Sequence, residues 1–279
     1  MTIKYYNSII RWFNYMQKVI NAHCHIYPEK IAEKAVLGIR DFYDLDMSLN
    51  GKLDDLIRDG SQVGVTHYLV HSVATTPKQV KSINEFIAEA VNSHPDLFTG
   101  FGTLHPDSDD IQSDFDYLIE LGLKGVKLHP DFQRFAMDDE RAFKIGEVVS
   151  KGKVPMLVHC GDFRYNYSNP KHIKAFLEKF PDITFIGAHF AGWSMWEEAT
   201  RQLSHFENLY VDLSSSLYAL TPETALELIH AYGADKVLWG TDYPMWESVS
   251  EMEYFNKIDL TEEERSKILY ENAAKLLKL

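Results

Sequence analysis

Short apolar runs alternate with stretches of helical spacing along most of the 279-residue chain. Residues 65–71 are rich in the β-branched and aromatic side chains that strands favour. In residues 78–93 apolar positions recur every three or four residues, as on one face of a helix. The pattern predicts eight strands, at residues 19–25, 65–71, 97–104, 125–130, 154–159, 183–189, 209–213 and 236–241. Helices are predicted at residues 31–39, 53–63, 78–93, 109–121, 139–151, 170–180, 193–206, 222–232 and 261–277, and residues 41–49 are predicted to be a loop over the strand ends.

Eight strand–helix alternations in this length predict an α/β fold, a single (β/α)8 TIM-type barrel over residues 16–279. The aromatic-rich residues 1–15 are predicted to form a short, helical N-terminal extension. An open, doubly wound sheet is the alternative. No predicted strand is followed by Gly-x-Gly-x-x-Gly, which argues against the dinucleotide-binding version of that sheet.

Composition and charge narrow the class of partner. The net charge is −13 and the sequence contains no cluster of basic residues, so neither nucleic acid nor an anionic membrane surface is an expected partner. Only Cys24 and Cys160 could form a disulfide, and no apolar run is long enough to span a membrane. We therefore expect a cytoplasmic protein with a small-molecule substrate, and the sequence leaves open whether it forms a homo-oligomer.

Two histidines end the first predicted strand. Side chains alternate between the faces of a strand, so His23 and His25 point the same way and Cys24 points the opposite way. Alone, His-x-His is more typical of two surface histidines at a strand end than of a metal site. Three later strands also end in ligand-type residues, namely His159, His189 and Asp242.

In a (β/α)8 barrel these strand ends meet at one face, so the side chains are predicted to converge there. Imidazole nitrogen together with carboxylate oxygen suits zinc, with manganese or iron as alternatives. The sequence favours one ion, held by His23, His25, one later histidine and Asp242, and leaves room for two ions.

The motifs resemble those of the amidohydrolase superfamily, in the branch called amidohydrolase 2. The similar segments are Asn21–His25, Gly125–Pro130, His159–Gly161, Gly187–His189, Gly240–Pro244 and Asn272–Ala274. The resemblance implies that His23, His25, His159 and Asp242 hold a metal that activates water. It also implies that His189 binds a second metal or polarises the substrate, and that Asp242 accepts the proton of the attacking water.

Lys127 has two interpretations. Strand alternation points it into the barrel, where a bare ammonium is costly. Several two-metal members of the superfamily carry a carboxylated lysine on the fourth strand, and the resemblance makes Lys127 a candidate metal ligand of that kind. The alternative is a lysine paired with Asp242 or another inward carboxylate.

The loops after the strands supply candidate substrate contacts. Arg164 follows the fifth strand and is predicted to clamp a substrate carboxylate, with Arg134 as its rival. The aromatic residues Trp193 and Tyr243, with Trp246, are predicted to wall the substrate. His71 and His105 end the second and third strands and are predicted either to support the residues that contact the metal or to be structural.

The predicted function is metal-dependent hydrolysis of an amide, lactone or ester bond in a small, carboxylate-bearing substrate, with Asp242 and His189 as catalytic residues. The alternative is a metal-dependent nonoxidative decarboxylase of a small aromatic or unsaturated acid. A nucleobase deaminase is a weaker prediction, because the His-x-Glu and Pro-Cys-x-x-Cys signature is absent.

Overall fold

A computed structural model describes residues 18–279, so the predicted N-terminal helix lies outside the described residues. The strands are β1 Val19–His25, β2 Val65–His71, β3 Phe98–Gly100, β4 Gly102–Thr103, β5 Val126–Leu128, β6 Met156–Val158, β7 Phe185–Gly187, β8 Leu209–Asp212 and β9 Val237–Leu238. The longer helices are α2 Glu29–Tyr43, α3 Leu53–Ser61, α4 Val80–Ser93, α5 Ile111–Glu120, α7 Glu140–Gly152, α8 Pro170–Lys179, α9 Trp196–Leu203, α10 Pro222–Tyr232 and α11 Ser248–Phe255. A short helix α6, Pro130–Gln133, follows β5, and the chain ends with α12 Glu262–Ser266, a π-helical turn Lys267–Glu271 and α13 Asn272–Leu277.

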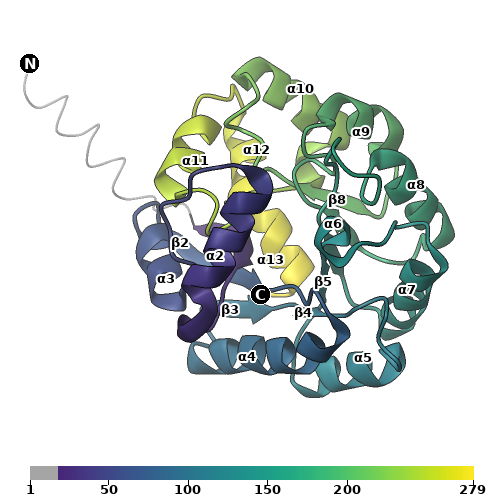
Figure 1. Ribbon diagram of the computed structural model, residues 1–279. Helices are drawn as coiled ribbons and strands as arrows, with labels where there is room; N and C mark the ends of the chain where they lie inside the picture. Colours follow the sequence, from purple (N-terminus) through teal and green to yellow (C-terminus); the bar gives the residue numbers. More distant parts are fainter. Residues whose placement is uncertain (1–17) are drawn as a thin grey trace, which may run out of the picture.

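The strands are parallel and close into a barrel ringed by helices (Figure 1). β3 and β4 are separated only by Phe101 and together form one of the eight strands of the barrel. The Phe101 N–H donates to the Val70 carbonyl at 3.0 Å, so pairing with β2 continues through the interruption. The barrel closes between its first and last strands, where the Ala22 N–H donates to the Trp239 carbonyl at 2.9 Å. The predicted (β/α)8 architecture is confirmed.

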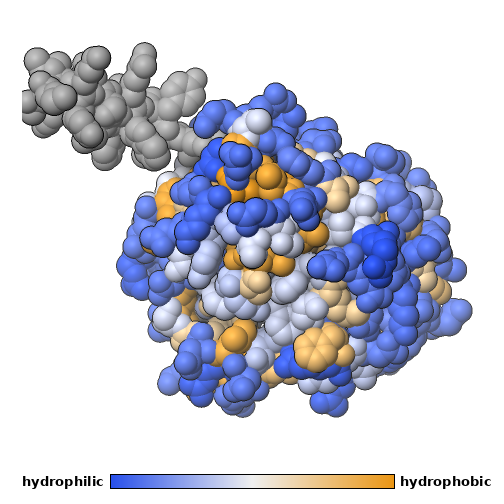
Figure 2. Space-filling view, turned by 90° about the horizontal axis from the view of Figure 1, so that it is seen from above, coloured by the Kyte–Doolittle hydropathy of each residue, from blue (hydrophilic) through white to orange (hydrophobic). Residues whose placement is uncertain are grey.

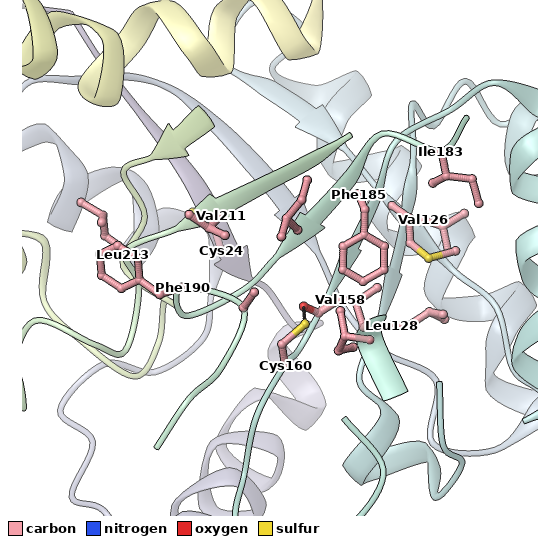
Figure 3. Close-up of a cluster of buried hydrophobic side chains, with 14 of the residues drawn as sticks. Cys24, Val126, Leu128, Val158, Cys160, Ile183, Phe185, Phe190, Val211 and Leu213 are labelled. Carbon is pink, nitrogen blue, oxygen red and sulfur yellow. Dashed lines mark hydrogen bonds between the residues drawn. The ribbon is translucent and has the colours of Figure 1, made fainter. Parts of the chain in front are cut away.

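The core forms two layers. Side chains on the outer face of the strands pack against the helices, and Figure 3 shows Cys24 and Cys160 among the buried side chains of this layer. Both cysteines are fully buried and unpaired, as the strand alternation predicts. The smaller layer fills the barrel interior with Ile20, Ala22, Leu69, Phe101, Leu157, Ile186, Ala188 and Leu238, and with Ala273 of α13.

An irregularity in β1 turns its histidines inward. Ile20 and Ala22 belong to the interior layer, so strict alternation would send His23 outward. The pairing of β1 with β2 shifts register between Asn21 and Cys24, as at a β-bulge. After the shift His23 and His25 face the interior and Cys24 the outer layer.

The ends of three strands and of one helix differ from prediction in a way that matters for function. Strands β6, β7 and β9 stop before His159, His189 and Asp242, so these residues lie in the turns after the strands. Helix α2 runs to Tyr43 rather than ending at Ile39, so the predicted loop 41–49 begins as helix. Figure 1 shows α2 lying across the front of the barrel.

No helix within residues 18–279 has the length and apolar character needed to cross a membrane. On the side shown in Figure 2, hydrophilic residues dominate and hydrophobic residues form small separate patches.

Candidate metal centre

The side chains of His23, His25 and Asp242 converge at the carboxyl end of the barrel. His23 Nε2 lies 3.3 Å from His25 Nε2 and 3.1 Å from Asp242 Oδ1, and His25 Nε2 lies 3.4 Å from the same oxygen. Donor atoms about 2.1 Å from one ion lie roughly 3.0 to 3.4 Å apart when they are neighbours in an octahedron or a tetrahedron. The three donors therefore have the spacing of metal ligands.

Lys127 lies beside this set. It is fully buried, and its Nζ is 3.1 Å from His23 Nε2. Within residues 18–279 no carboxylate approaches Lys127 Nζ closely enough for an ion pair, so the structure does not support the predicted alternative of a pair with Asp242. Burial lowers the pKa of Lys127 to about 8, so its neutral amine is accessible near neutral pH.

His159 and His189 form a second pair of donors. His159 Nδ1 lies 3.0 Å from His189 Nε2, and that nitrogen lies 3.9 Å from Asp242 Oδ2. His189 begins a left-handed turn with Phe190 and Ala191, whose φ angles are 60°, 53° and 55°. This conformation is costly for side chains other than glycine, so the turn that aims His189 into the barrel stores strain at the site.

A buried carboxylate fixes the ring of His23. Asp212 Oδ2 lies 2.9 Å from His23 Nδ1, and Ser214 Oγ donates to Asp212 Oδ1 at 2.5 Å. Burial alone would raise the pKa of Asp212, but the adjacent His23 ring lowers that pKa to about 2. Asp212 thus remains an acceptor for the Nδ1 proton, and Nε2 of His23 is left free to bind a metal.

His189 is oriented in the same manner by the backbone. Its Nδ1 donates to the Ser214 carbonyl at 2.9 Å, which leaves Nε2 as the free nitrogen. His23, His189 and Asp212 lie close enough to suggest a separate ion site. However, His23 Nδ1 faces the Asp212 carboxylate and His189 Nδ1 faces the Ser214 carbonyl, so both of these nitrogens carry protons. We therefore assign Asp212 to orientation rather than to metal binding.

Asp242 is held from its other side. Ser215 Oγ donates to Asp242 Oδ2 at 2.6 Å and itself accepts from Trp246 Nε1 at 2.9 Å. Burial acts to raise the pKa of Asp242, but His23 and His25 hold it well below its usual value. The carboxylate is consequently ionised at neutral pH with Oδ1 turned toward the two histidines.

Orphaned polar atoms at the site test whether a metal fits. Both ring nitrogens of His71, which is fully buried against His23 and His25, lack a hydrogen-bond partner among residues 18–279. His159 Nε2 is likewise unpartnered, with Asp131 Oδ2 at 3.7 Å. Buried nitrogens without partners are costly. Their presence beside converging free nitrogens and an ionised carboxylate fits a site made for a hydrated divalent ion.

The group His129, Asp131 and His159 is a poorer candidate for a second, separate ion. The rings of His129 and His159 stack 3.9 Å apart at 5° between their planes. Ring nitrogens bind a metal within the ring plane, and parallel planes do not meet at one point. The stack, continued by Phe132 at 3.7 Å from His129, instead fixes the plane of His159.

A family model described as Amidohydrolase matches residues 20–279. The chain belongs to the amidohydrolase family. No curated protein matches the chain significantly.

Solved structures similar to this amidohydrolase share its barrel. An uncharacterised TIM-barrel protein from Bordetella bronchiseptica has a TM-score of 0.79 at 20% identity, covering 94% of this chain and 98% of that one. A dihydroxybenzoic acid decarboxylase from Polaromonas sp., with bound manganese and an inhibitor, has 0.71 at 19%, covering 95% and 98%. An Acinetobacter baumannii protein provisionally assigned as a 2-pyrone-4,6-dicarboxylic acid hydrolase has 0.68 at 16%, covering 94% and 99%. At these identities the likeness concerns the fold, and the neighbours include both reaction types.

The cavity of this amidohydrolase has a volume of about 20 Å³, room for little more than one water molecule. Of the predicted substrate contacts, only Trp193 and Trp246 reach the space next to Asp242. A substrate therefore has to displace side chains at the mouth to reach the donors. The other lining residues include Tyr27, Ile39, Tyr43, Phe132, Pro244 and Met245.

Arg164 and Tyr243 are not brought to this space. Arg164 makes two hydrogen bonds to Asp162, at 2.9 and 2.8 Å, and a third to the Phe42 carbonyl. The Tyr243 hydroxyl turns away from the site and donates to the Lys52 carbonyl at 2.8 Å. Arg134, the rival of Arg164, is exposed.

Sequence reasoning missed Asp212, Ser214, Ser215 and Tyr43. A signal existed for the first three, because Asp212 and the three serines 214–216 follow an apolar strand at the functional end of the barrel. Tyr43 gave no such signal, since its place depends on how far α2 extends. His71, predicted to be structural or to support the metal-contacting residues, lies directly against the donors His23 and His25.

Proposed function

We propose that this amidohydrolase is a metal-dependent hydrolase that acts on an amide, lactone or ester bond of a small substrate. One observation carries the proposal. His23 and His25 lie beside one oxygen of Asp242, and His189, which pairs with His159, lies 3.9 Å from the other oxygen of the same carboxylate. Such an arrangement suits hydrolysis, in which a nucleophile and a carbonyl oxygen need stabilisation side by side.

In this proposal His23, His25 and Asp242 hold the first ion, with Lys127 as a further ligand if its amine is carboxylated. His159 and His189 hold a second ion or polarise the substrate carbonyl. The ion, which we propose to be zinc, would lower the pKa of water and so supply a nucleophile at neutral pH. Manganese remains an alternative, because a structurally similar decarboxylase was solved with it.

The protein's own groups divide the remaining work. Asp242 Oδ1 accepts a proton from the nucleophile and returns it to the leaving group. Ser215 keeps that oxygen in place through its bond to Oδ2. Asp212 maintains the tautomer of His23 that leaves Nε2 free. Burial of all these groups excludes bulk water, which strengthens each electrostatic contact.

Nonoxidative decarboxylation of a small aromatic acid is the second candidate. The aromatic rings of Tyr43, Phe132 and Trp193 around the cavity favour a flat substrate. Against it, the described residues bring no free arginine to the cavity to hold a carboxylate, since Arg164 is bound to Asp162. We therefore place hydrolysis first.

The test is a substrate screen on zinc-loaded and manganese-loaded protein. One panel contains small amides, lactones and esters, and the other contains hydroxylated benzoic acids assayed for carbon dioxide release. The proposal predicts hydrolysis that is lost on chelation and restored by the metal. Carbon dioxide release without hydrolysis would overturn it in favour of the decarboxylase, and activity that survives complete chelation would overturn both. Asp182→Asn, an exposed substitution, is the control for handling.

A further inference from the structure

The end of helix α2 holds Tyr43 over the donor cluster. The residue after it, Asp44, has a left-handed backbone with φ 54°, which stops the helix there. Arg164 donates to the Phe42 carbonyl at 2.9 Å, and its guanidinium lies 5.2 Å from the centre of the Tyr43 ring. Since Asp162 in turn fixes Arg164, the tyrosine is anchored from the loop after β6.

The hydroxyl of Tyr43 lies 2.9 Å from His129 Nε2. The contact made by the other ring nitrogen of His129 shows whether Tyr43 or His129 is the donor. His129 caps helix α6, and its Nδ1 accepts the Phe132 N–H at 3.3 Å. A neutral imidazole carries one proton, so the proton of His129 is on Nε2. Burial keeps the pKa of His129 well below its usual value, in agreement with a neutral ring.

The Nε2–H of His129 therefore donates to the Tyr43 oxygen, and the proton of the Tyr43 hydroxyl is not used in that contact. Among residues 18–279 this hydroxyl has no other hydrogen-bond partner. Tyr43 also lines both adjoining parts of the cavity, together with His159, His189 and Asp242. A partly buried donor that lines this space can be satisfied by whatever occupies it.

We propose that Tyr43 is a catalytic residue that touches the substrate and donates its hydroxyl proton in a hydrogen bond to a substrate oxygen next to the metal. The inference rests on the proposed function and deepens it. It requires a substrate with an acceptor oxygen at the reacting end, such as a carbonyl or a carboxylate. In hydrolysis the same donor stabilises the negative charge that develops on that oxygen.

The environment keeps the phenol in its donating form. Burial, with Asp242 and Asp131 nearby, raises the pKa of Tyr43 well above its usual value, so the hydroxyl retains its proton throughout the working range of pH. A neutral donor of this kind does not repel the bound cation, as an arginine in the same place would.

The first experiment measures the binding of acetohydroxamic acid, a small chelator whose oxygens also accept hydrogen bonds, to zinc-loaded protein by calorimetry. Tyr43→Phe should bind zinc as wild type does and bind the hydroxamate about tenfold more weakly. The matched control is Tyr165→Phe, whose ring stacks on Phe42 in the same cluster and which should bind as wild type does. Equal hydroxamate affinity for Tyr43→Phe and wild type would overturn the inference and leave the proposed function standing. Failure of all three proteins to bind zinc would overturn the proposed function and with it the inference.

The second experiment determines the tautomer of His129 by nitrogen-15 NMR of the metal-free, full-length protein. The inference predicts a proton on Nε2 and none on Nδ1. A proton on Nδ1 would contradict the inference, because the Tyr43 hydroxyl would then donate its proton to His129 Nε2. This result does not depend on zinc binding or on activity, so it tests the inference about Tyr43 separately from the proposed function.

Discussion

The two ends of the barrel interior are built on the same strands from opposite kinds of side chain. At the amino end the interior is apolar, with residues such as Leu157 and Leu238 fully buried. Two residues beyond Leu157 stands His159, and four beyond Leu238 stands Asp242. Within a few residues, each of these two chain segments changes from side chains that stabilise the core to side chains that can bind a metal.

The polar carboxyl end lowers the stability of the fold, whereas the apolar amino end raises it. Apolar side chains at the amino end lose water and gain close packing, which stabilises the fold. At the carboxyl end His71 and His159 keep buried nitrogens that have no partner among residues 18–279, and His189 stands on a left-handed turn. We infer that a bound ion compensates for this cost, and that the apolar end provides the stability that tolerates it.

The largest expected effect is that of Asp242→Asn at the carboxyl end. The substitution keeps a ligand oxygen and the size of the side chain but removes its charge and basicity. Metal affinity should fall only partly, because the histidines remain, while turnover should fall on the order of a hundredfold or more. The measurement is bound metal and rate on one preparation, with Asp182→Asn as control. Full metal with near-normal turnover would leave Asp242 as a structural carboxylate.

Leu157→Ala and His159→Ala, two residues apart, compare the two ends directly. Leu157→Ala should lower the free energy of unfolding by about 2–5 kcal/mol, through lost burial and a cavity, and leave the metal content of the folded protein unchanged. His159→Ala should remove the ion that His159 and His189 would hold in the two-ion arrangement and should cost less stability in the metal-free protein. Urea unfolding and elemental analysis give the two readouts. The comparison fails if Leu157→Ala removes the metal as thoroughly as His159→Ala does.

Asp212→Asn should weaken metal binding without removing a ligand. The amide cannot hold the Nδ1 proton of His23 as the carboxylate does, so we expect about 10- to 100-fold lower zinc affinity. Competition with a chelator measures this, and Asp235→Asn, an exposed position, is the control. Unchanged zinc affinity would mean that the contact of 2.9 Å between Asp212 and His23 has no role in orienting the ring.

Glu251, a buried carboxyl outside the donor cluster, gives a prediction for stability rather than for metal binding. Both its oxygens lack partners among residues 18–279, and burial raises its pKa to about 8 from a usual 4.5. The folded protein thus retains a proton that the unfolded chain releases, so stability falls as pH rises from 4.5 to 8, by at most about 1.4 kcal/mol per pH unit. Glu251→Gln should remove this contribution, so its stability relative to wild type should rise between pH 5 and pH 8.

Thermal unfolding at the two pH values checks this expectation. The exposed Glu253→Gln on the same helix is the control and should show no such trend. A constant difference between Glu251→Gln and wild type across the range would contradict the predicted loss of stability with rising pH.

The order of the barrel strands and most of the donor positions could be predicted from the sequence. Apolar runs mark the strands because each is buried on both faces, and the fold brings their carboxyl ends together. The shift in β1 could not be predicted, since alternation from Ile20 sends His23 to the wrong face. Only pairing with β2 reveals the extra residue.

Contacts made through loops were the least predictable. Arg164 looked free to bind a substrate, but Asp162, two residues earlier, binds it in the folded chain. Asp212 was missed because its role is defined by His23, which is 189 residues away in the sequence. Tyr43 depends on the last turn of α2, and helix ends are the part of a sequence-based prediction that long-range packing most often changes.

The most direct test of the account is the metal content of the purified protein, grown and purified with zinc and manganese present. We predict at least one ion per chain in wild type and in His205→Ala, an exposed histidine, and loss of most of the bound metal in His23→Ala. A ratio near two would favour separate ions on the two donor sets, and a ratio near one a single ion at His23, His25 and Asp242. A ratio near zero in wild type, or an equal ratio in His23→Ala, would contradict the claim that the carboxyl end of this barrel is a metal centre.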